Sequence, residues 1–225
     1  MGHWIDLDTE HGRIAGWYAA PVGLSRGGVV VVQEIFGLNG HIRSVVDRVA
    51  AAGFTALAPA LFDPVERGVE LAYDDAGVAR GRQLTAALGF DRALELVSAS
   101  AEHLQLEGLR TGVVGFCWGG TLSYLSAARL GLPAVDYYGA RSVDFLDQRN
   151  DGEPLLAPLL CHFGEHDASI PPEAIALHRR KLPGAIIHLY PAGHGFNCDP
   201  RRDYHQASAE LAWQRSIDFL AENLR

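Results

Sequence analysis

The amino-acid sequence predicts an α/β fold with a mostly parallel central sheet and helices on both faces. Solidly apolar runs such as Gly28–Gln33 and Thr111–Phe116 have the composition of strands that are buried on both faces. Runs with helical spacing of apolar residues separate these strands, as residues 42–52 do after the first of them. An alternation of strands and helices is typical of parallel sheets.

The other elements continue this alternation along the chain. Gly53 and Pro59 bracket a short strand, and a long helix is expected to be interrupted or loosened near Gly89. Residues 65–73 show no firm pattern. In chain order we predict strands over 12–20, 28–33, 54–58, 111–116, 134–138, 159–163 and 185–190, and helices over 42–52, 84–106, 121–130, 173–181 and 204–223.

Length and composition favour one globular domain spanning residues 1–225. Hydrophobic residues make up 48% of the chain and charged residues 20%. The net charge of -8 and the lack of a basic run argue against nucleic acid or an anionic membrane as a partner. No stretch reaches the roughly 18 apolar residues of a membrane span, and the start does not resemble a signal peptide. Three scattered cysteines predict a reducing, cytoplasmic location without a disulfide framework.

A predicted strand ends directly before Cys117, within Gly115-Phe116-Cys117-Trp118-Gly119-Gly120. This is the pattern of a G-x-S-x-G nucleophile elbow with cysteine in place of serine. Such a turn is tight, so glycines are needed where the strand and the helix approach each other. The backbone N–H of Trp118 opens the following helix and could hold an oxyanion. Alternatively, Cys117 is a buried cysteine that fills space beside a turn.

Two later loops supply an acid and a base. Asp167 follows the strand that ends at Phe163-Gly164, and His194 lies between two glycines after the last strand. Each could be an ordinary loop residue. Together they follow the order nucleophile, acid, histidine that the α/β-hydrolase fold imposes, each at the carboxyl end of a strand. We therefore predict a Cys117–His194–Asp167 triad, with Glu165 and His166 as loop positions.

Glu34 ends the buried strand 28–33, in the stretch Gln33-Glu34-Ile35-Phe36-Gly37. In the α/β-hydrolase fold this loop provides a second oxyanion donor, here the N–H of Ile35. A glutamate at the end of an apolar strand is costly to bury without a partner. A solvated carboxylate at the start of a loop is the alternative.

Together with Tyr137-Tyr138-Gly139 and Ala192-Gly193-His194-Gly195-Phe196, these motifs resemble the dienelactone hydrolase (carboxymethylenebutenolidase-like) family over nearly the whole chain. The resemblance implies a monomeric hydrolase of small esters or lactones with no cofactor and no metal. It also implies that Glu34 accepts the proton of the resting thiol. The candidate substrate-binding residues are Phe36, Tyr138, Arg80 and Arg82.

The sequence departs from the family where an arginine that holds the substrate carboxylate is expected. Asn197-Cys198-Asp199 follows the histidine motif instead, which leaves Arg80, Arg82, Arg201 and Arg202 as candidates. We therefore expect neutral esters to be accepted comparatively well. Cys161 is expected in the core, and Cys198 is expected to be exposed near the mouth of the site.

Two other functions remain open. A redox or protein-repair protein could pair Cys117 with Glu34 on the same kind of sheet, although that group lacks the late Asp-then-His order. A non-catalytic ligand-binding module could keep the fold, but it would be expected to lose a triad member.

Overall fold

The computed structural model describes residues 1–225, and the chain divides into two units. The first unit contains residues 1–113 and 224–225, and the second contains residues 114–223. Strand β5 (Thr111–Phe116) carries the chain from the first unit into the second. The expectation of a single domain stays a prediction. None of the helices is both long enough and apolar enough to cross a bilayer.

The strands of the first unit follow the order β1-β2-β4-β3. Strands β1 (His3–Thr9) and β2 (Gly12–Ala19) form an antiparallel hairpin, and β2 also pairs antiparallel with β4 (Thr55–Pro59). Strand β3 (Gly28–Val32) pairs parallel with β4, and both are buried along their whole length. The sequence predicted β2, β3 and β4 to within a few residues but did not predict β1.

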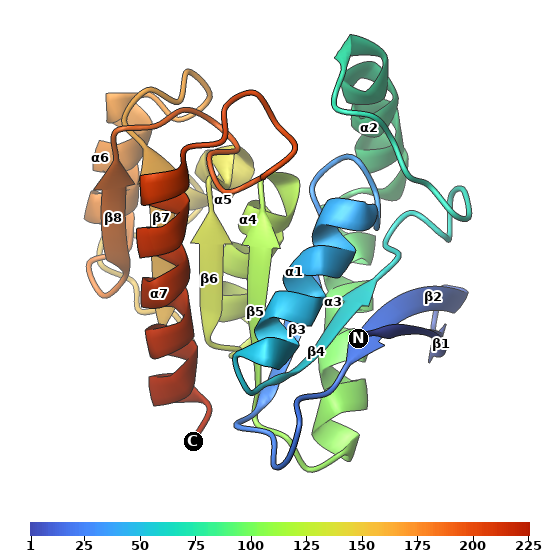
Figure 1. The fold of residues 1–225 in the computed structure, drawn as a ribbon. Coiled ribbons are helices and arrows are strands. Elements are labelled where there is room, and N and C mark those ends of the chain that lie inside the picture. Colours follow the sequence, from blue (N-terminus) through green and yellow to red (C-terminus); the bar gives the residue numbers. More distant parts are fainter. The chain divides into compact units, whose positions relative to one another are not determined.

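Three helices complete the first unit: α1 (Gly40–Ala51), α2 (Asp75–Leu88) and α3 (Phe90–Leu106). Helices α1 and α3 pack on opposite faces of the strands (Figure 1). The interruption predicted near Gly89 within 84–106 is confirmed, because Gly89, with a φ of 77°, separates α2 from α3. The start of α2 was not predicted. It lies nine residues before Leu84, at an Asp74 cap that accepts the N–H of Gly77 at 2.7 Å.

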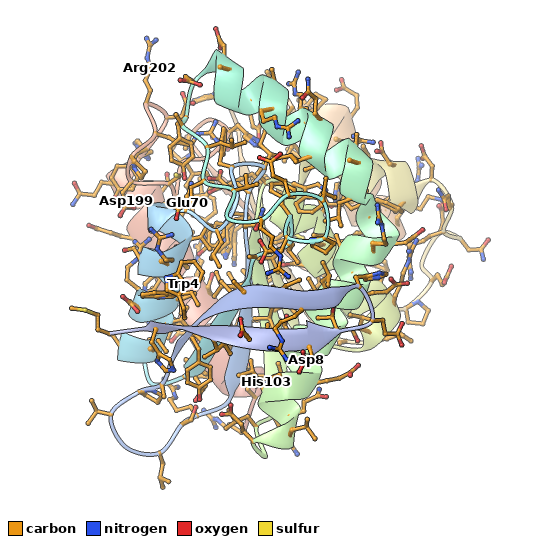
Figure 2. All side chains as sticks on the ribbon, turned by 90° about the vertical axis from the view of Figure 1, so that its right-hand side faces the viewer. Trp4, Asp8, Glu70, His103, Asp199 and Arg202 are labelled. Carbon is orange, nitrogen blue, oxygen red and sulfur yellow. The ribbon has the colours of Figure 1, made fainter.

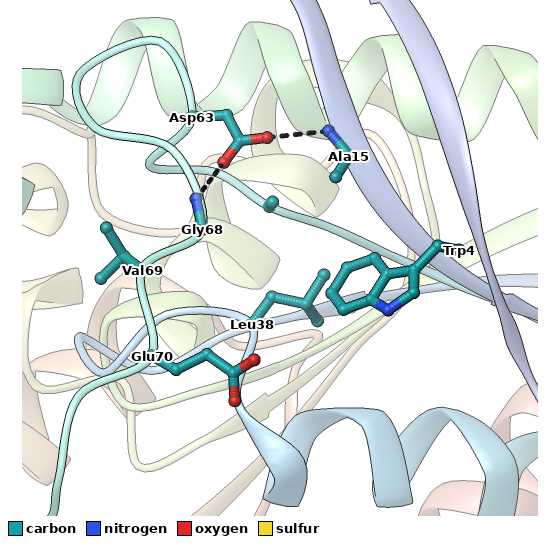
Figure 3. A pocket seen from close by; sticks show the side chains of 8 residues that line it. Trp4, Ala15, Leu38, Asp63, Gly68, Val69 and Glu70 are labelled. Carbon is teal, nitrogen blue, oxygen red and sulfur yellow. Dashed lines mark hydrogen bonds between the residues drawn. The ribbon is translucent and has the colours of Figure 1, made fainter.

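A pocket of about 250 Å³ lies in the first unit (Figure 3). The half-exposed indole of Trp4, on the outer strand of the hairpin, forms one wall (Figure 2). The carboxylate of Asp63 is already used, because it accepts the N–H of Ala15 at 2.8 Å and that of Gly68 at 3.2 Å. This carboxylate therefore fastens the loop that follows β4 to the hairpin.

The second unit continues with the strand order β5-β6-β7-β8. Strand β7 (Leu159–Gly164) pairs parallel with both β6 (Ala134–Tyr137) and β8 (Ile186–Tyr190). The sequence predicted all three strands. Their carboxyl ends lead into the loops that carry Tyr138, Asp167 and His194.

Helices flank these strands, with α7 on one face and α4 on the other (Figure 1). The predicted helix over 121–130 begins earlier and changes character, because its last five residues form a π-helix. The short helices after β6 were not predicted. The helical segments are α4 (Trp118–Leu125), the π-helix Ser126–Leu130, the 3₁₀ helix Ala140–Ser142, α5 (Val143–Leu146), α6 (Pro172–Lys181) and α7 (Gln206–Asn223).

A buried polar network attaches α7 to the strands. The Ser216 hydroxyl lies 2.7 Å from the Tyr137 hydroxyl and 3.0 Å from His162 Nε2, while His162 Nδ1 lies 2.8 Å from the Tyr190 hydroxyl. Burial holds the pKa of His162 well below its usual value, so the imidazole is neutral. Each ring nitrogen has a partner, which is what a buried histidine requires.

Candidate active site

The backbone turns sharply at Cys117, between β5 and α4. Cys117 has a φ of 55° and a ψ of -113°, a conformation that is strained for a residue with a side chain. Its N–H donates to Tyr137 O at 2.9 Å, and its carbonyl accepts the N–H of Gly120 at 3.0 Å. The turn is thus fixed by β6 on one side and by α4 on the other, and the half-buried thiol stands at the start of the helix.

Gly115 permits this turn because a Cβ there would overlap Gly119 O and would lie 2.6 Å from Ser123 Oγ. Gly119 O is a backbone atom, so it cannot move aside as a flexible side chain can. This agrees with the expectation that a glycine is needed where the strand and the helix approach each other.

Gly115→Ala is expected to lower the free energy of unfolding by about 2 kcal/mol or more, because the added methyl group overpacks a rigid contact. Urea unfolding measures this. The matched control is Gly184→Ala, where a Cβ meets nothing within 4 Å and a change within about 0.5 kcal/mol is expected. Equal unfolding midpoints for the two variants would contradict the overlap.

Asp167 and His194 form a hydrogen-bonded pair. His194 Nδ1 lies 2.7 Å from Asp167 Oδ2, and the carboxylate side chain has no exposed surface. The other oxygen, Oδ1, accepts the N–H of Ser169 at 2.8 Å. With Nδ1 donating to the carboxylate, the imidazole leaves Nε2 for the thiol.

The backbone brings the two loops together. Glu165 N–H donates to Tyr190 O at 2.8 Å, and His166 N–H donates to Ala192 O at 3.0 Å. Gly164 allows this approach, since a Cβ there would overlap Ala192 O. Glu165 and His166 lie in a loop, as predicted, and their side chains are exposed.

Electrostatics favour a charged imidazole. Burial alone would lower the pKa of His194. Interactions with Cys117 and with the Asp167 carboxylate, both of which are hydrogen-bonded to the imidazole, outweigh burial and raise this pKa to about 10. The site can therefore hold a thiolate–imidazolium pair and move a proton between its two members.

The chain matches a known protein family over nearly its whole length. The model of the dienelactone hydrolase family matches residues 14–224, nearly the whole chain. The chain belongs to the dienelactone hydrolase family. The predicted family and the prediction of a hydrolase are thereby confirmed.

Relatives within the dienelactone hydrolase family match at similar length. A Synechocystis protein provisionally named carboxymethylenebutenolidase is 35% identical, with 94% of this chain and 92% of the relative covered. Carboxymethylenebutenolidase 1 of Cupriavidus pinatubonensis is 31% identical, with 93% and 92% covered. The crystal structure of a provisionally named dienelactone hydrolase from Klebsiella pneumoniae has a TM-score of 0.83 and 29% identity, with 99% and 98% covered. This similarity confirms the α/β-hydrolase fold.

The other predicted site residues have these places in the structure. In the second unit, Trp118 is the first residue of α4, and the fully buried Tyr138 packs its ring 5.1 Å from the His194 ring. In the first unit, Glu34 and Phe36 are buried and Ile35 is half-buried. Burial overturns the alternative of a solvated Glu34. The roles of these residues stay predictions.

The arginines differ in their surroundings. Arg80 and Arg82 are exposed on α2, where Arg80 pairs with Glu66. Arg202 extends from its loop into solvent (Figure 2). Arg201 is largely covered, and a Cβ at Gly195, next to His194, would lie 2.6 Å from its Nη1. The sequence pointed to Arg201 and Arg202 alike, because only the folded loop brings the Arg201 guanidinium beside Gly195.

The three cysteines are free. Cys161 is in the core, as predicted. The prediction that Cys198 is exposed is wrong. Its N–H donates to Gly195 O at 2.9 Å, so the chain turns back after the histidine and buries the side chain completely.

Proposed function

We propose that this chain hydrolyses small esters or lactones through a Cys117–His194–Asp167 triad and a covalent acyl-enzyme. The observation that carries the proposal is the 2.7 Å hydrogen bond from His194 to the buried Asp167. The Cys117 thiol, at the strained elbow, is hydrogen-bonded to the same imidazole. Membership of the dienelactone hydrolase family supports the reaction class.

Acylation begins with the thiolate form of Cys117, whose proton His194 Nε2 has taken. Sγ attacks the carbonyl carbon, and the carbonyl π electrons move to oxygen. The N–H of Trp118, at the positive end of α4, is directed at the developing oxyanion. When the carbonyl re-forms, the bond to the alkoxy group breaks and His194 gives its proton to the departing oxygen.

Deacylation reverses these roles with water. Neutral His194 takes a proton from a water molecule that attacks the thioester, and then returns that proton to the departing sulfur. Asp167 stabilises the imidazolium that forms in each half of the cycle and keeps the imidazole in one tautomer. No metal or redox partner is needed to balance these steps.

Trapping of the acyl-enzyme tests the proposal. The protein is mixed with p-nitrophenyl acetate, quenched with acid, digested and analysed by peptide mass spectrometry. We expect one acetyl group on the peptide that contains Cys117, and none on that peptide in Cys117→Ala. Turnover with acetyl transfer to another side chain, or with no acyl-enzyme under single-turnover conditions, would contradict the triad.

Substrate charge gives a separate prediction. The enzyme is expected to prefer a carboxylated substrate over its methyl ester by less than about tenfold in kcat/KM, or ~1.4 kcal/mol, because no arginine directly follows the histidine motif. A larger preference for the acid would contradict it. Arg201→Gln, with the solvent-exposed Arg202→Gln as its matched control, would then show whether Arg201 binds the carboxylate.

A further inference from the structure

Within the second unit, the triad leaves one buried carboxyl group unused, that of Asp136. Asp136 lies in β6 with no exposed surface, within an otherwise apolar strand. Its Oδ1 accepts the N–H of Gly139 at 2.7 Å, and the Ser142 hydroxyl donates to Oδ2 at 3.5 Å. The carboxyl group thus binds the turn that follows its own strand.

This carboxyl group also packs against the start of α4. A Cβ at Gly120 would overlap Asp136 Oδ1 and would lie 2.5 Å from Tyr137 O. A Cβ at Gly139 would lie 2.5 Å from Asp136 Oδ1 and 2.6 Å from the N atom of Thr121. Two glycines therefore make room for the carboxyl group between the elbow helix and the turn.

The turn that follows β6 packs against His194, the proposed catalytic base. Tyr138 has a φ of 45°, one of the chain's two positive values outside glycine, and the other belongs to Cys117. Such a conformation persists only when its surroundings enforce it. Asp136 holds the residue that follows Tyr138, and the Tyr138 ring packs against His194.

Charge links Asp136 to the triad as well. Burial raises the pKa of Asp136 to about 7, although the bonds from Gly139 and Ser142 and the positive charge of His194 act in the opposite direction. Cys161, opposite Asp136 on β7, stays a neutral thiol because burial raises its pKa well above the usual value. On α4 the neighbours are Gly120 and Thr121, which carry no charge. The cation that favours the charged form of this carboxyl group is His194.

We propose that Asp136 is a positioning residue for the hydrolysis. Its carboxylate holds the 138–142 turn in place and stabilises the cationic form of His194. Activity then increases as Asp136 loses its proton. The inference rests on the proposed roles of His194 and Cys117.

The coupling can be measured without turnover. The protein is labelled with ¹³C-aspartate, the Asp136 carboxyl signal is assigned by its loss in Asp136→Asn, and its titration is followed by NMR. The wild type is expected to titrate near pH 7. In His194→Gln the midpoint should rise by about half a unit or more, because the cation that favours the carboxylate is gone. An unchanged midpoint would overturn the inference, even if the triad is correct.

The pH profile tests the effect on catalysis. In the wild type, kcat for p-nitrophenyl acetate should rise by about fivefold as pH increases through 7, since a nearby carboxylate stabilises the imidazolium. Asp136→Asn keeps an acceptor for Gly139 N–H but has no charge, so it should lose this rise without a change in KM or in the unfolding midpoint at pH 6. Asp136→Ala also loses the acceptor and should have a kcat at least about tenfold lower than wild type at pH 8.

A pH profile of kcat that is identical in Asp136→Asn and in the wild type would overturn the inference. A different result is expected if the proposed function itself is wrong. Cys117→Ala would then still hydrolyse p-nitrophenyl acetate, while the titration midpoint of Asp136 would still depend on His194.

Discussion

Cys117→Ala is expected to reduce kcat for p-nitrophenyl acetate by about three orders of magnitude or more. The variant has no nucleophile, and the remaining triad residues cannot compensate because the three act as a unit. The fold should tolerate the change, since alanine is smaller than cysteine and the half-buried thiol is not part of the core. Steady-state kinetics on protein with a normal circular dichroism spectrum measure the effect.

Cys161→Ala is the matched control for this loss. Cys161 is fully buried in β7, and burial keeps its thiol protonated, so it cannot act as a nucleophile. Its kcat should stay within about threefold of wild type. Loss of activity in Cys161→Ala together with normal activity in Cys117→Ala would show that Cys161, and not Cys117, is the nucleophile.

Asp167→Asn is expected to lower kcat by about a hundredfold or more, somewhat less than the loss of the nucleophile. Asparagine fits the same space, but its amide group can donate to Nδ1 and so favours the wrong tautomer of His194. The pKa of His194 should fall as well, because the Asp167 carboxylate, which raises it, is removed. Kinetics and an NMR titration of the imidazole measure the two effects.

Glu165→Gln provides the matched change of an acid to its amide two residues away. The Glu165 side chain is exposed, and only its backbone N–H takes part in holding the loop. Its kcat should therefore equal that of the wild type within about twofold. Wild-type kcat in Asp167→Asn with a loss in Glu165→Gln would show that Glu165 is the acid.

The fold class could be predicted because fully buried strands leave a strong apolar signal. β3 and β4 are buried at every position and were found to within a few residues. β1 was missed because only Leu7 of its seven residues is buried, so the strand has almost no apolar pattern. Its pairing with β2 depends on backbone hydrogen bonds, which composition does not reveal.

The missed start of α2 has a different physical reason. Few of its side chains are buried, and two of the four buried positions are Gly77 and Gly81, which are poor helix formers. The signal that could have found it is Asp74, a residue type that caps helices and does so here. Capping is thus more informative than periodicity for a helix that is mostly exposed.

The residues of the candidate triad could be found because each follows a strand in a fixed chain order. Asp136 could not be given a role, although an aspartate inside the apolar run 134–138 was a visible signal. Gly139, which donates to the Asp136 carboxylate, is close to it in sequence. The packing of Asp136 against Gly120, however, arises only when β6 lies beside the elbow. The error at Cys198 has the same origin, because a short polar-looking stretch gives no sign of turning inward.

The backbone bonds that join the two loops of the second unit also suggest where probes can be attached. Glu165 and His166 hold the Asp167 loop against Tyr190 and Ala192 through main-chain atoms alone. Their side chains project into solvent and can be exchanged without altering these bonds. A fluorophore or spin label at either position would report on the catalytic pair from within two residues of Asp167, so the chemistry could be followed in real time with the catalytic groups themselves unmodified.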